Sequence, residues 1–311
     1  MANINLNNIK TYSVKNRPSK VKTVDFAKTG KKGRRFIDFY NGLPNMLKAI
    51  ELKALVDAVI SARKKNKPVI LMLGAHVIKC GLSPLIIDLI KKNIITTVAF
   101  NGAGIIHDAE VAMVGYTSED VASALEDGSF GMAKETADFI NLATKDAAKK
   151  NIGLGKAVGQ AINKAGLKYK ELSILAAADR KDIAVTVHVA IGADIIHQHP
   201  SCDGASLGKA TLNDFHIFIG EVAGLGNGGV VINVGSAVIL PEVFLKALNT
   251  ARNLGRDVKN FTTANFDMIA QYRPYQNVLK RPVSSGGRAI SITGHHEIMI
   301  PLLYQAIIEK I

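Results

Sequence analysis

The sequence predicts an α/β fold in which a mainly parallel β-sheet is covered by helices on both faces. Short, continuous apolar runs such as PVILMLGAH (68–76) and GGVVINVGS (228–236) are typical of strands that are buried on both faces. Helical patterns of roughly 10–15 residues separate these runs, and this alternation is typical of βαβ units. The composition agrees, because 48% of the residues are hydrophobic and Trp is absent, which favours an aliphatic core.

The expected elements follow in order along the chain. A turn at 41–44 precedes a helix that ends near residue 62, and the strand at 68–76 follows. A helix over 82–92 leads to a second strand at 94–104, which closes on glycines. Helices are then expected near 105–114, 117–126, 130–148 and 153–165, followed by apolar runs at 171–178, 183–190 and 193–199, the last of which is expected to end a strand. The remaining elements are a helix at 207–221, a strand at 228–236, a helix at 241–255, strands at 261–266 and 288–293, and a terminal helix from residue 296.

The net charge of +13 is concentrated at the start of the chain. Residues 1–35 hold ten Lys and Arg residues against one acid, Asp25. We predict a basic arm over 1–35, either a solvated tail or a strap across a partner subunit, and a single α/β domain over 36–311. Contact with nucleic acid is an alternative use of the arm. We do not expect it, because basic and aromatic residues are not interleaved and no known reader motif occurs.

The sequence gives no sign of secretion or of a membrane span. Cys80 and Cys202 do not make a disulfide framework. The first twenty residues lack the apolar stretch of a signal peptide, and no window is apolar over the ~20 residues that a span needs. We therefore expect a soluble, cytoplasmic protein without a membrane partner.

Small residues gather where the predicted strands end. Ligands of an open parallel sheet bind outside the carboxyl ends of the strands. Here those ends read GAHVIKCG (74–81), NGAG (101–104), HQHPSCDGASLG (197–208), NVGSA (233–237), TTANFD (262–267) and ITGHHE (292–297). Glycine lets the backbone approach a ligand, and helix N-termini favour phosphate, although neither GxGxxG followed by an acidic residue nor GxxxxGK[ST] occurs. We predict a small-molecule site for a nucleotide cofactor along this edge, which we call the rim.

Titratable side chains share the rim and leave a second interpretation open. They are His107 with Asp108, His197 with His199 and Asp203, Glu242, and His295 with His296 and Glu297. Alternation along a strand would point His197 and His199 to one face, and two imidazoles beside a carboxylate could ligate a metal. Alternatively, each histidine hydrogen-bonds to backbone or solvent, which is the interpretation we prefer for His76, His188 and His216.

Read in order, the rim segments resemble motifs of the deoxyhypusine synthase family. GAHVIKCG is similar to the family's segment after its first sheet strand, AFNGAGIIHD to T-A-G-G-I-E-E-D, and HPSCDGASLGKATLNDF to P-x-x-D-G-S-L-G-D. NVGSAVILPEVFLKAL takes the place of G-G-G-V-x-K-H-H, TTANFD resembles N-T-A-Q-E-F-D, and HHEIMIPLL resembles D-A-x-x-x-F-P-L-L. The match keeps one register over about residues 40–311.

The resemblance implies a Rossmann-like, doubly wound domain in a homotetramer built as a dimer of dimers, with NAD held between subunits. Members of the family are transferases that oxidise spermidine with NAD. They pass its aminobutyl group to an enzyme lysine as an imine, and then to a protein lysine or another amine. Carried over by position, the NAD site comprises Gly74, Ala75, His76, Asn101, Gly102, Ala103, Gly104, Gly235, Ser236, Asp267, Thr293 and Gly294. The polyamine end would use Asp203, and we place His197 and His199 with it as substrate-binding candidates.

Departures from the family pattern fall beside the expected pocket. The paired glutamates of E-E-D are Ile106 and His107 here, and the K-H-H segment reads Ile239-Leu240-Pro241 followed by Glu242. The final acid of D-G-S-L-G-D is replaced by Lys209. These changes argue against deoxyhypusine synthesis itself.

The catalytic lysine of the family's S-W-G-K motif has no direct counterpart. The nearest candidate is Lys280, which Arg273 and Arg281 could make nucleophilic, because a nearby cation lowers the pKa of a lysine. The candidate catalytic residues are Lys280, Glu242, His107 and Asp108.

Three functions remain open on sequence grounds. The first, which we prefer, is an NAD-dependent enzyme that acts on an amine or polyamine. The second is a metal-assisted hydrolase, in which His107, Asp108, His197, His199 and Asp203 would hold a metal-bound water. The third is a non-catalytic nucleotide or RNA-binding protein that uses the basic arm.

Overall fold

The computed structural model describes residues 4–311, and in that part of the chain six strands form one parallel sheet. The strands are β1 (Val69–Leu73), β2 (Thr97–Asn101), β3 (Ala184–His188), β4 (Val230–Val234), β5 (Phe261–Asp267) and β6 (Gly287–Thr293). Their order is β3-β2-β1-β4-β5-β6, and every neighbouring pair is parallel. This is the doubly wound Rossmann-like order, so the predicted α/β class is confirmed.

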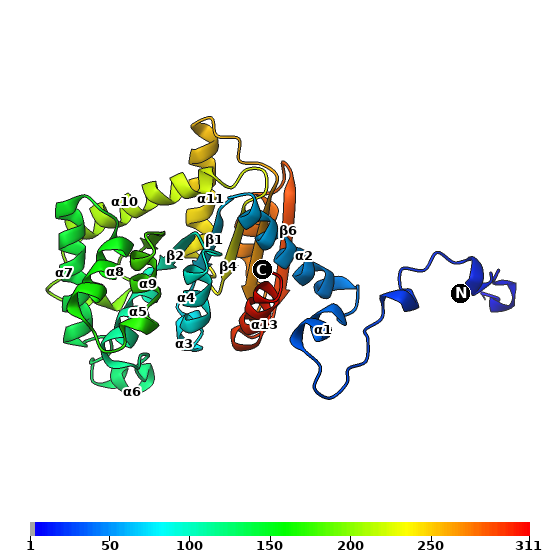
Figure 1. Cartoon of the computed structure of the whole chain (residues 1–311), viewed down its shortest axis with the longest axis horizontal. Coiled ribbons are helices and arrows are strands. Elements are labelled where there is room, and N and C mark those ends of the chain that lie inside the picture. Colours follow the sequence, from blue (N-terminus) through cyan, green and yellow to red (C-terminus); the bar gives the residue numbers. More distant parts are fainter. Residues whose placement is uncertain (1–3) are drawn as a thin grey trace.

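Helices connect the strands and cover both faces of the sheet (Figure 1). They are α1 (Phe36–Asn41), α2 (Leu47–Lys64), α3 (His76–Lys79), α4 (Ser83–Lys91), α5 (Gly102–Val114), α6 (Val121–Glu126), α7 (Lys134–Lys150), α8 (Leu154–Ala165), α9 (Ile174–Arg180), α10 (Gly204–Ala223), α11 (Ile239–Asn253), α12 (Tyr272–Pro274) and α13 (His296–Ile308). A π-helical turn, Tyr275–Lys280, continues α12. Short 3₁₀ turns occupy Leu6–Asn8, Val14–Asn16, Thr23–Asp25, Lys170–Leu172 and Ile195–Gln198.

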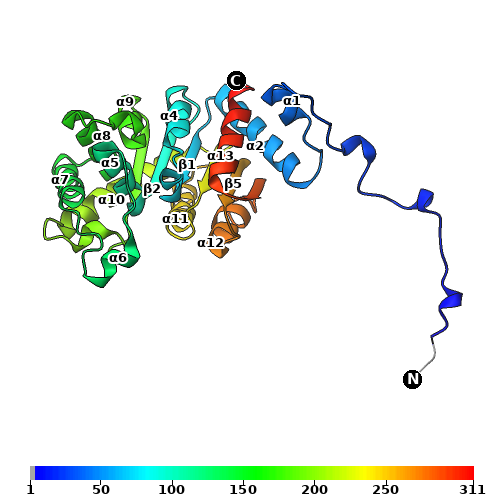
Figure 2. The same cartoon turned by 90° about the horizontal axis from the view of Figure 1, so that it is seen from below.

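Alternation along β1 explains why both faces of the sheet are apolar. Val69, Leu71 and Leu73 belong to a core cluster that includes residues of α2, α4 and α13. Ile70 and Met72 belong to a second cluster with residues of α10 and α11. Figure 2 shows the two helical layers on opposite sides of the strands. Since successive side chains of a strand point to opposite faces, a strand between two helical layers needs an apolar residue at every position.

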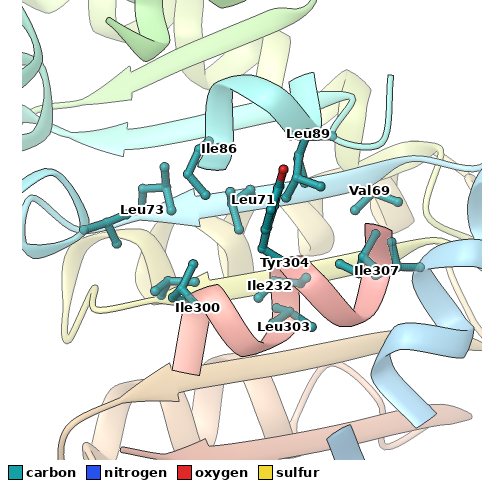
Figure 3. Close-up of a pocket in the computed structure, with 14 residues that line it drawn as sticks. Val69, Leu71, Leu73, Ile86, Leu89, Ile232, Ile300, Leu303, Tyr304 and Ile307 are labelled. Carbon is teal, nitrogen blue, oxygen red and sulfur yellow. The ribbon is translucent and has the colours of Figure 1, made fainter. Parts of the chain in front are cut away.

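The terminal helix α13 closes one face of the sheet over β1 and β4 (Figure 3). It leaves an apolar cavity of about 20 Å³, lined by residues such as Leu71, Ile232 and Leu303. The hydroxyl of Tyr304 donates to the Asp88 carboxylate at 2.8 Å and so joins α13 to α4. A void of this size holds about one water-sized probe and no organic ligand, so we assign it to core packing.

Two of the apolar runs adopt structures that the sequence interpretation did not predict. Residues 171–178 form a 3₁₀ turn and the start of α9 rather than an extended run, because the Ser173 side chain caps the helix and the Ala-rich segment that follows is a good helix former. The run at 193–199 ends no strand. It forms a 3₁₀ turn, Ile195–Gln198, so the expected alternation of His197 and His199 is wrong.

The described part of the basic arm extends away from the rest of the chain (Figures 1 and 2). Every side chain over 4–24 is exposed. The arm joins the body through the Asp25 carbonyl, which accepts from the Asn45 amide at 2.9 Å, and through the Lys28 amide, which donates to the Gly42 carbonyl at 2.9 Å. Residues 1–3 of the predicted arm lie outside the described residues. In the part of the chain that the structure describes, no helix is long and apolar enough to cross a membrane.

Candidate functional site

In folds of this strand order ligands bind in a crevice at the switch point, which here lies between β1 and β4 at the centre of the rim. Gly74 follows β1, and its amide donates to the Val234 carbonyl at 2.9 Å. A Cβ atom at residue 74 would lie 2.1 Å from the Gly235 carbonyl oxygen. Gly235 follows β4 with φ +66°, a left-handed conformation that favours glycine. The two glycines are therefore required by close backbone approach at the switch point.

His296, at the start of α13, lies over Gly235. Its Nε2 atom would be 2.8 Å from a Cβ atom at residue 235, and its ring meets that of His76 edge-on at 5.7 Å between centroids. The side chain is 1% exposed, and its Nδ1 atom is buried without a hydrogen-bond partner. Burial lowers the pKa of His296, although the charge of Asp267 opposes this shift. The crevice thus contains a neutral imidazole with an unused polar atom.

Asn233, in the middle of β4, forms hydrogen bonds with residues next to the crevice. Its Nδ2 atom donates to the Ser236 carbonyl at 3.0 Å and to the Asn265 side chain at 2.7 Å. Its own Oδ1 atom is buried without a partner. Sequence reasoning missed Asn233, although an amide inside the apolar run VVINV was the available signal.

The start of α5 forms the next part of the rim. The Asn101 side chain caps this helix by accepting from the Gly104 amide at 3.0 Å. Gly102 lies against the carboxylate of Asp194, since a Cβ atom there would be 2.0 Å from Oδ2. Burial raises the pKa of Asp194, while its hydrogen bond from the Ala190 amide, 3.3 Å long, acts in the opposite direction. Asp194, in the loop after β3, thus packs against the start of α5.

The ends of β5 and β6 complete the rim. Asp267 is buried, its carboxylate accepts from the Met268 amide at 2.8 Å, and its carbonyl accepts from the Gly294 amide at 3.0 Å. Thr293 is exposed beside it. The structure therefore places every residue of the predicted cofactor site at or just after the end of β1, β2, β4, β5 or β6.

Glu242, in the first turn of α11, is held by one residue of the same helix and by two from the segment after β5. It forms ion pairs with Lys246 and Arg273 and accepts from the Asn277 amide group at 2.8 Å. These two cations lower the pKa of Glu242 to about 2. The carboxylate is therefore ionised, but its charge is already paired within the chain.

Lys280 lies apart from the rim of its own subunit. It is exposed at the end of the π-helical turn that leads from α12 towards the start of β6. The residues after Lys280 lead to the start of β6, at the opposite end of this strand from the rim.

Asp108 and His107 point in different directions although they are adjacent on α5. Asp108 is fully buried, and its carboxylate accepts from the Ser173 hydroxyl at 2.6 Å and from the Ile174 and Leu175 amides at 2.8 and 3.2 Å. Burial raises the pKa of Asp108 to about 6, and the three hydrogen bonds limit the shift. Asp108 therefore fixes the start of α9 and does not face the rim.

The other predicted titratable residues have separate partners. The His197 Nδ1 atom accepts from the Gly192 amide at 3.3 Å, and His199 Nε2 lies 2.8 Å from the Gly131 carbonyl. Asp203 caps α10 by accepting from the Ser206 amide at 2.9 Å, a contact that lowers its pKa. No three His, Cys, Asp or Glu residues within 4–311 come together in a way that could hold a metal ion. The metal interpretation is therefore not supported.

Comparison with known proteins gives a match at the level of the fold only. The sequence matches no protein-family model and no curated protein. The solved structure of a "putative deoxyhypusine synthase from Entamoeba histolytica" superposes with a TM-score of 0.54 at 10% identity, over 90% of this chain and 95% of that chain. AgrE in ternary complex with ornithine and NAD⁺ gives 0.51 at 12% identity, over 84% of this chain and 33% of AgrE. ArgZ, an arginine dihydrolase from the ornithine-ammonia cycle in cyanobacteria, gives 0.50 at 11% identity, over 86% of this chain and 34% of ArgZ.

These neighbours show which fold the chain shares. It spans about a third of the AgrE and ArgZ chains and nearly all of the Entamoeba protein. The chain therefore shares a Rossmann-like α/β fold with these three structures. At 10–12% identity this similarity shows the fold and does not assign a specific activity to the chain.

Proposed function

We propose that this chain binds NAD in the crevice between β1 and β4 and acts as an NAD-dependent enzyme on an amine or polyamine. The observation that carries the proposal is the pair of touching glycines at the switch point, with the unpartnered polar atom of His296 beside them. The solved complex of AgrE, a neighbour in fold, contains ornithine and NAD⁺. The resemblance of the rim motifs to the deoxyhypusine synthase family points to the same pair of ligand classes.

The residues of the crevice fit a dinucleotide. Small residues follow β1 and β4, so no bulky side chain of residues 74, 75, 235 or 236 occupies the switch point at which a dinucleotide would bind. A buried polar atom without a partner is rare in proteins, so the free Nδ1 of His296 is a candidate contact for the cofactor. When bound, NAD would supply a hydride acceptor. The chain itself would bind and orient it.

The proposal assigns different weights to the predicted substrate residues. Asp203 is half-buried with a lowered pKa, so it is ionised and a candidate for contact with a cationic group. Glu242 is already paired with two cations, so it is a weaker candidate. Aminobutyl transfer through Lys280 requires a homo-oligomer that brings this residue to the crevice of a neighbouring subunit.

Calorimetric titration of the full-length protein with NAD⁺ tests the proposal. We expect saturable binding, and we expect His296→Ala to weaken it by about tenfold or more, because a buried hydrogen bond is lost. His216→Ala is the matched control, since His216 is exposed on α10 away from the crevice. Absence of binding by NAD⁺ and NADH at millimolar concentration would refute the proposal.

A further inference from the structure

A second cavity lies beside the rim, between α5, the start of α7 and the loops 116–119 and 193–195. It has a volume of about 560 Å³, which is within the range of sites for small organic molecules. Ala103, in the first turn of α5, lines it, so the cavity borders the predicted cofactor residues 101–104. We call it the α5–α7 cavity.

The walls of the α5–α7 cavity are mainly apolar. Ile106, Met113, Phe130 and Ile195 lie among its lining residues. Several apolar side chains at its edge are exposed, including Tyr116 at 74% and Val121 at 47%. Covering such surface with an apolar ligand is favourable, because each Å² of apolar area removed from water contributes roughly 25 cal/mol.

The charge of the lining is opposite to that of the chain as a whole. Four carboxylates line the cavity, those of Glu110, Glu119, Glu135 and Asp194, whereas the net charge of the protein is +13. Lys79 is the one lysine or arginine among the described lining residues. His107 adds no positive charge near neutral pH, because burial and the proximity of Lys79 lower its pKa to about 4.

Glu110 is held in a fixed orientation inside the cavity. Its Oε1 atom accepts from the Thr136 hydroxyl at 3.0 Å, and its Oε2 atom accepts from the Thr117 hydroxyl. The Thr117 oxygen is in turn 2.6 Å from His107 Nδ1. The Glu110 side chain is 17% exposed. Among residues 4–311 its one ion-pair partner is His107, whose Nδ1 lies 3.8 Å from Oε2 and which is uncharged near neutral pH, so no lysine or arginine pairs with this half-buried carboxylate.

We propose that the α5–α7 cavity binds an organic cation with a single ammonium or guanidinium head and an apolar body, the head contacting Glu110. The four carboxylates disfavour a nucleotide, whose phosphates they would repel. A polyamine fits less well, because its inner nitrogens would lie against apolar walls without hydrogen-bond partners, which is costly. That this cation is the substrate rests on the proposed NAD-dependent function, since the cavity meets the cofactor residues at Ala103. Binding of the cation to the cavity does not depend on that function.

Titration of the full-length protein with 3-phenylpropylamine and with 3-phenylpropan-1-ol separates charge from shape. We expect the amine to bind at least about tenfold more tightly than the alcohol, because the charged head gains a charge-assisted hydrogen bond. Equal affinities would overturn the proposal. Tighter binding of spermidine or adenosine than of the amine, when lost on blocking the cavity, would also overturn it and would assign the cavity to that ligand.

Three variants locate the site. Glu110→Gln keeps the shape of the side chain. It should lower the affinity for the amine by about tenfold and leave the affinity for the alcohol unchanged. Ala133→Phe places a large side chain at the exposed edge of the cavity, so it should weaken both ligands without affecting the fold. Glu126→Gln, exposed on α6 outside the lining, is the matched control. If neither Glu110→Gln nor Ala133→Phe weakens the amine, the site is elsewhere and the proposal fails.

Titration of the same samples with NAD⁺ keeps the two proposals distinct. Amine binding without NAD⁺ binding would refute the cofactor proposal and support the cation site. NAD⁺ binding without amine binding would support the cofactor proposal and refute the cation site.

Discussion

Replacing Gly74 by alanine tests the geometry of the switch point most directly. The added Cβ atom would lie 2.1 Å from the Gly235 carbonyl oxygen and 3.1 Å from the Ser236 amide nitrogen. Both neighbours are backbone atoms, and Gly74 is itself fixed by its hydrogen bond to Val234, so no flexible side chain can move aside. Overpacking costs about 1–3 kcal/mol, and a contact between rigid backbones should lie near the upper end.

We therefore expect Gly74→Ala to lower the free energy of unfolding by about 3 kcal/mol and the Tm by about 6 °C. The substitution should also lower the affinity for NAD⁺, because β1 and β4 must move apart at the crevice to make room for the added Cβ atom. Gly220→Ala is the control: a Cβ atom there meets nothing within 4 Å, and in the last turn of α10 it should stabilise the protein by about 0.5 kcal/mol. Thermal denaturation and calorimetry measure both. An unchanged Tm with unchanged NAD⁺ affinity in Gly74→Ala would refute the close approach of the two backbones.

Three other predictions concern parts of the molecule outside the switch point. Burial raises the pKa of Asp214 from 3.8 to about 8, so its contribution to stability is fully present below about pH 4 and is lost progressively as the pH rises from 4 to 8; Asp214→Asn should flatten the dependence of the Tm on pH between about 4 and 8, and a curve parallel to that of the wild type would contradict this assignment. Deletion of residues 1–24 should leave the Tm and NAD⁺ affinity unchanged, since 4–24 are exposed, and a fall in RNA affinity after the deletion would support the nucleic-acid alternative. Borohydride trapping with a labelled polyamine and NAD⁺ should label the wild type and not Lys280→Ala; a label that persists in the variant would move the nucleophile elsewhere.

The sequence predicted the strands well because their burial has a local signature. Runs such as VILML and VVINV need apolar residues on both faces, so no long-range information is required to recognise them. The run at 171–178 was harder to interpret, because the features that make it helical lie in Ser173 and in the distant Asp108, whose carboxylate accepts from the first amides of α9. The sequence shows no link between positions 108 and 174.

The candidate site was predictable only as far as strand ends are predictable. Gly74, Gly235 and Asp267 were placed on the rim because the ends of parallel strands lie along one edge of the sheet. The contact of His296 with Gly235 and the enclosure of Glu110 depend on how α13, α5 and α7 pack. The metal interpretation found no support for the same reason, since His197 and His199 are close in sequence but have separate partners in space.

The position of Asp194 makes the two proposed ligands dependent on each other. Its carboxylate lies against Gly102 at the start of α5, and the same residue lines the α5–α7 cavity. A cation in the cavity would attract this carboxylate and hold the loop after β3 in place before the cofactor arrives. Each ligand should then raise the affinity for the other by the same factor, because linkage between two binding equilibria is reciprocal. An enzyme built in this way would retain its cofactor most firmly when an amine is present to use it.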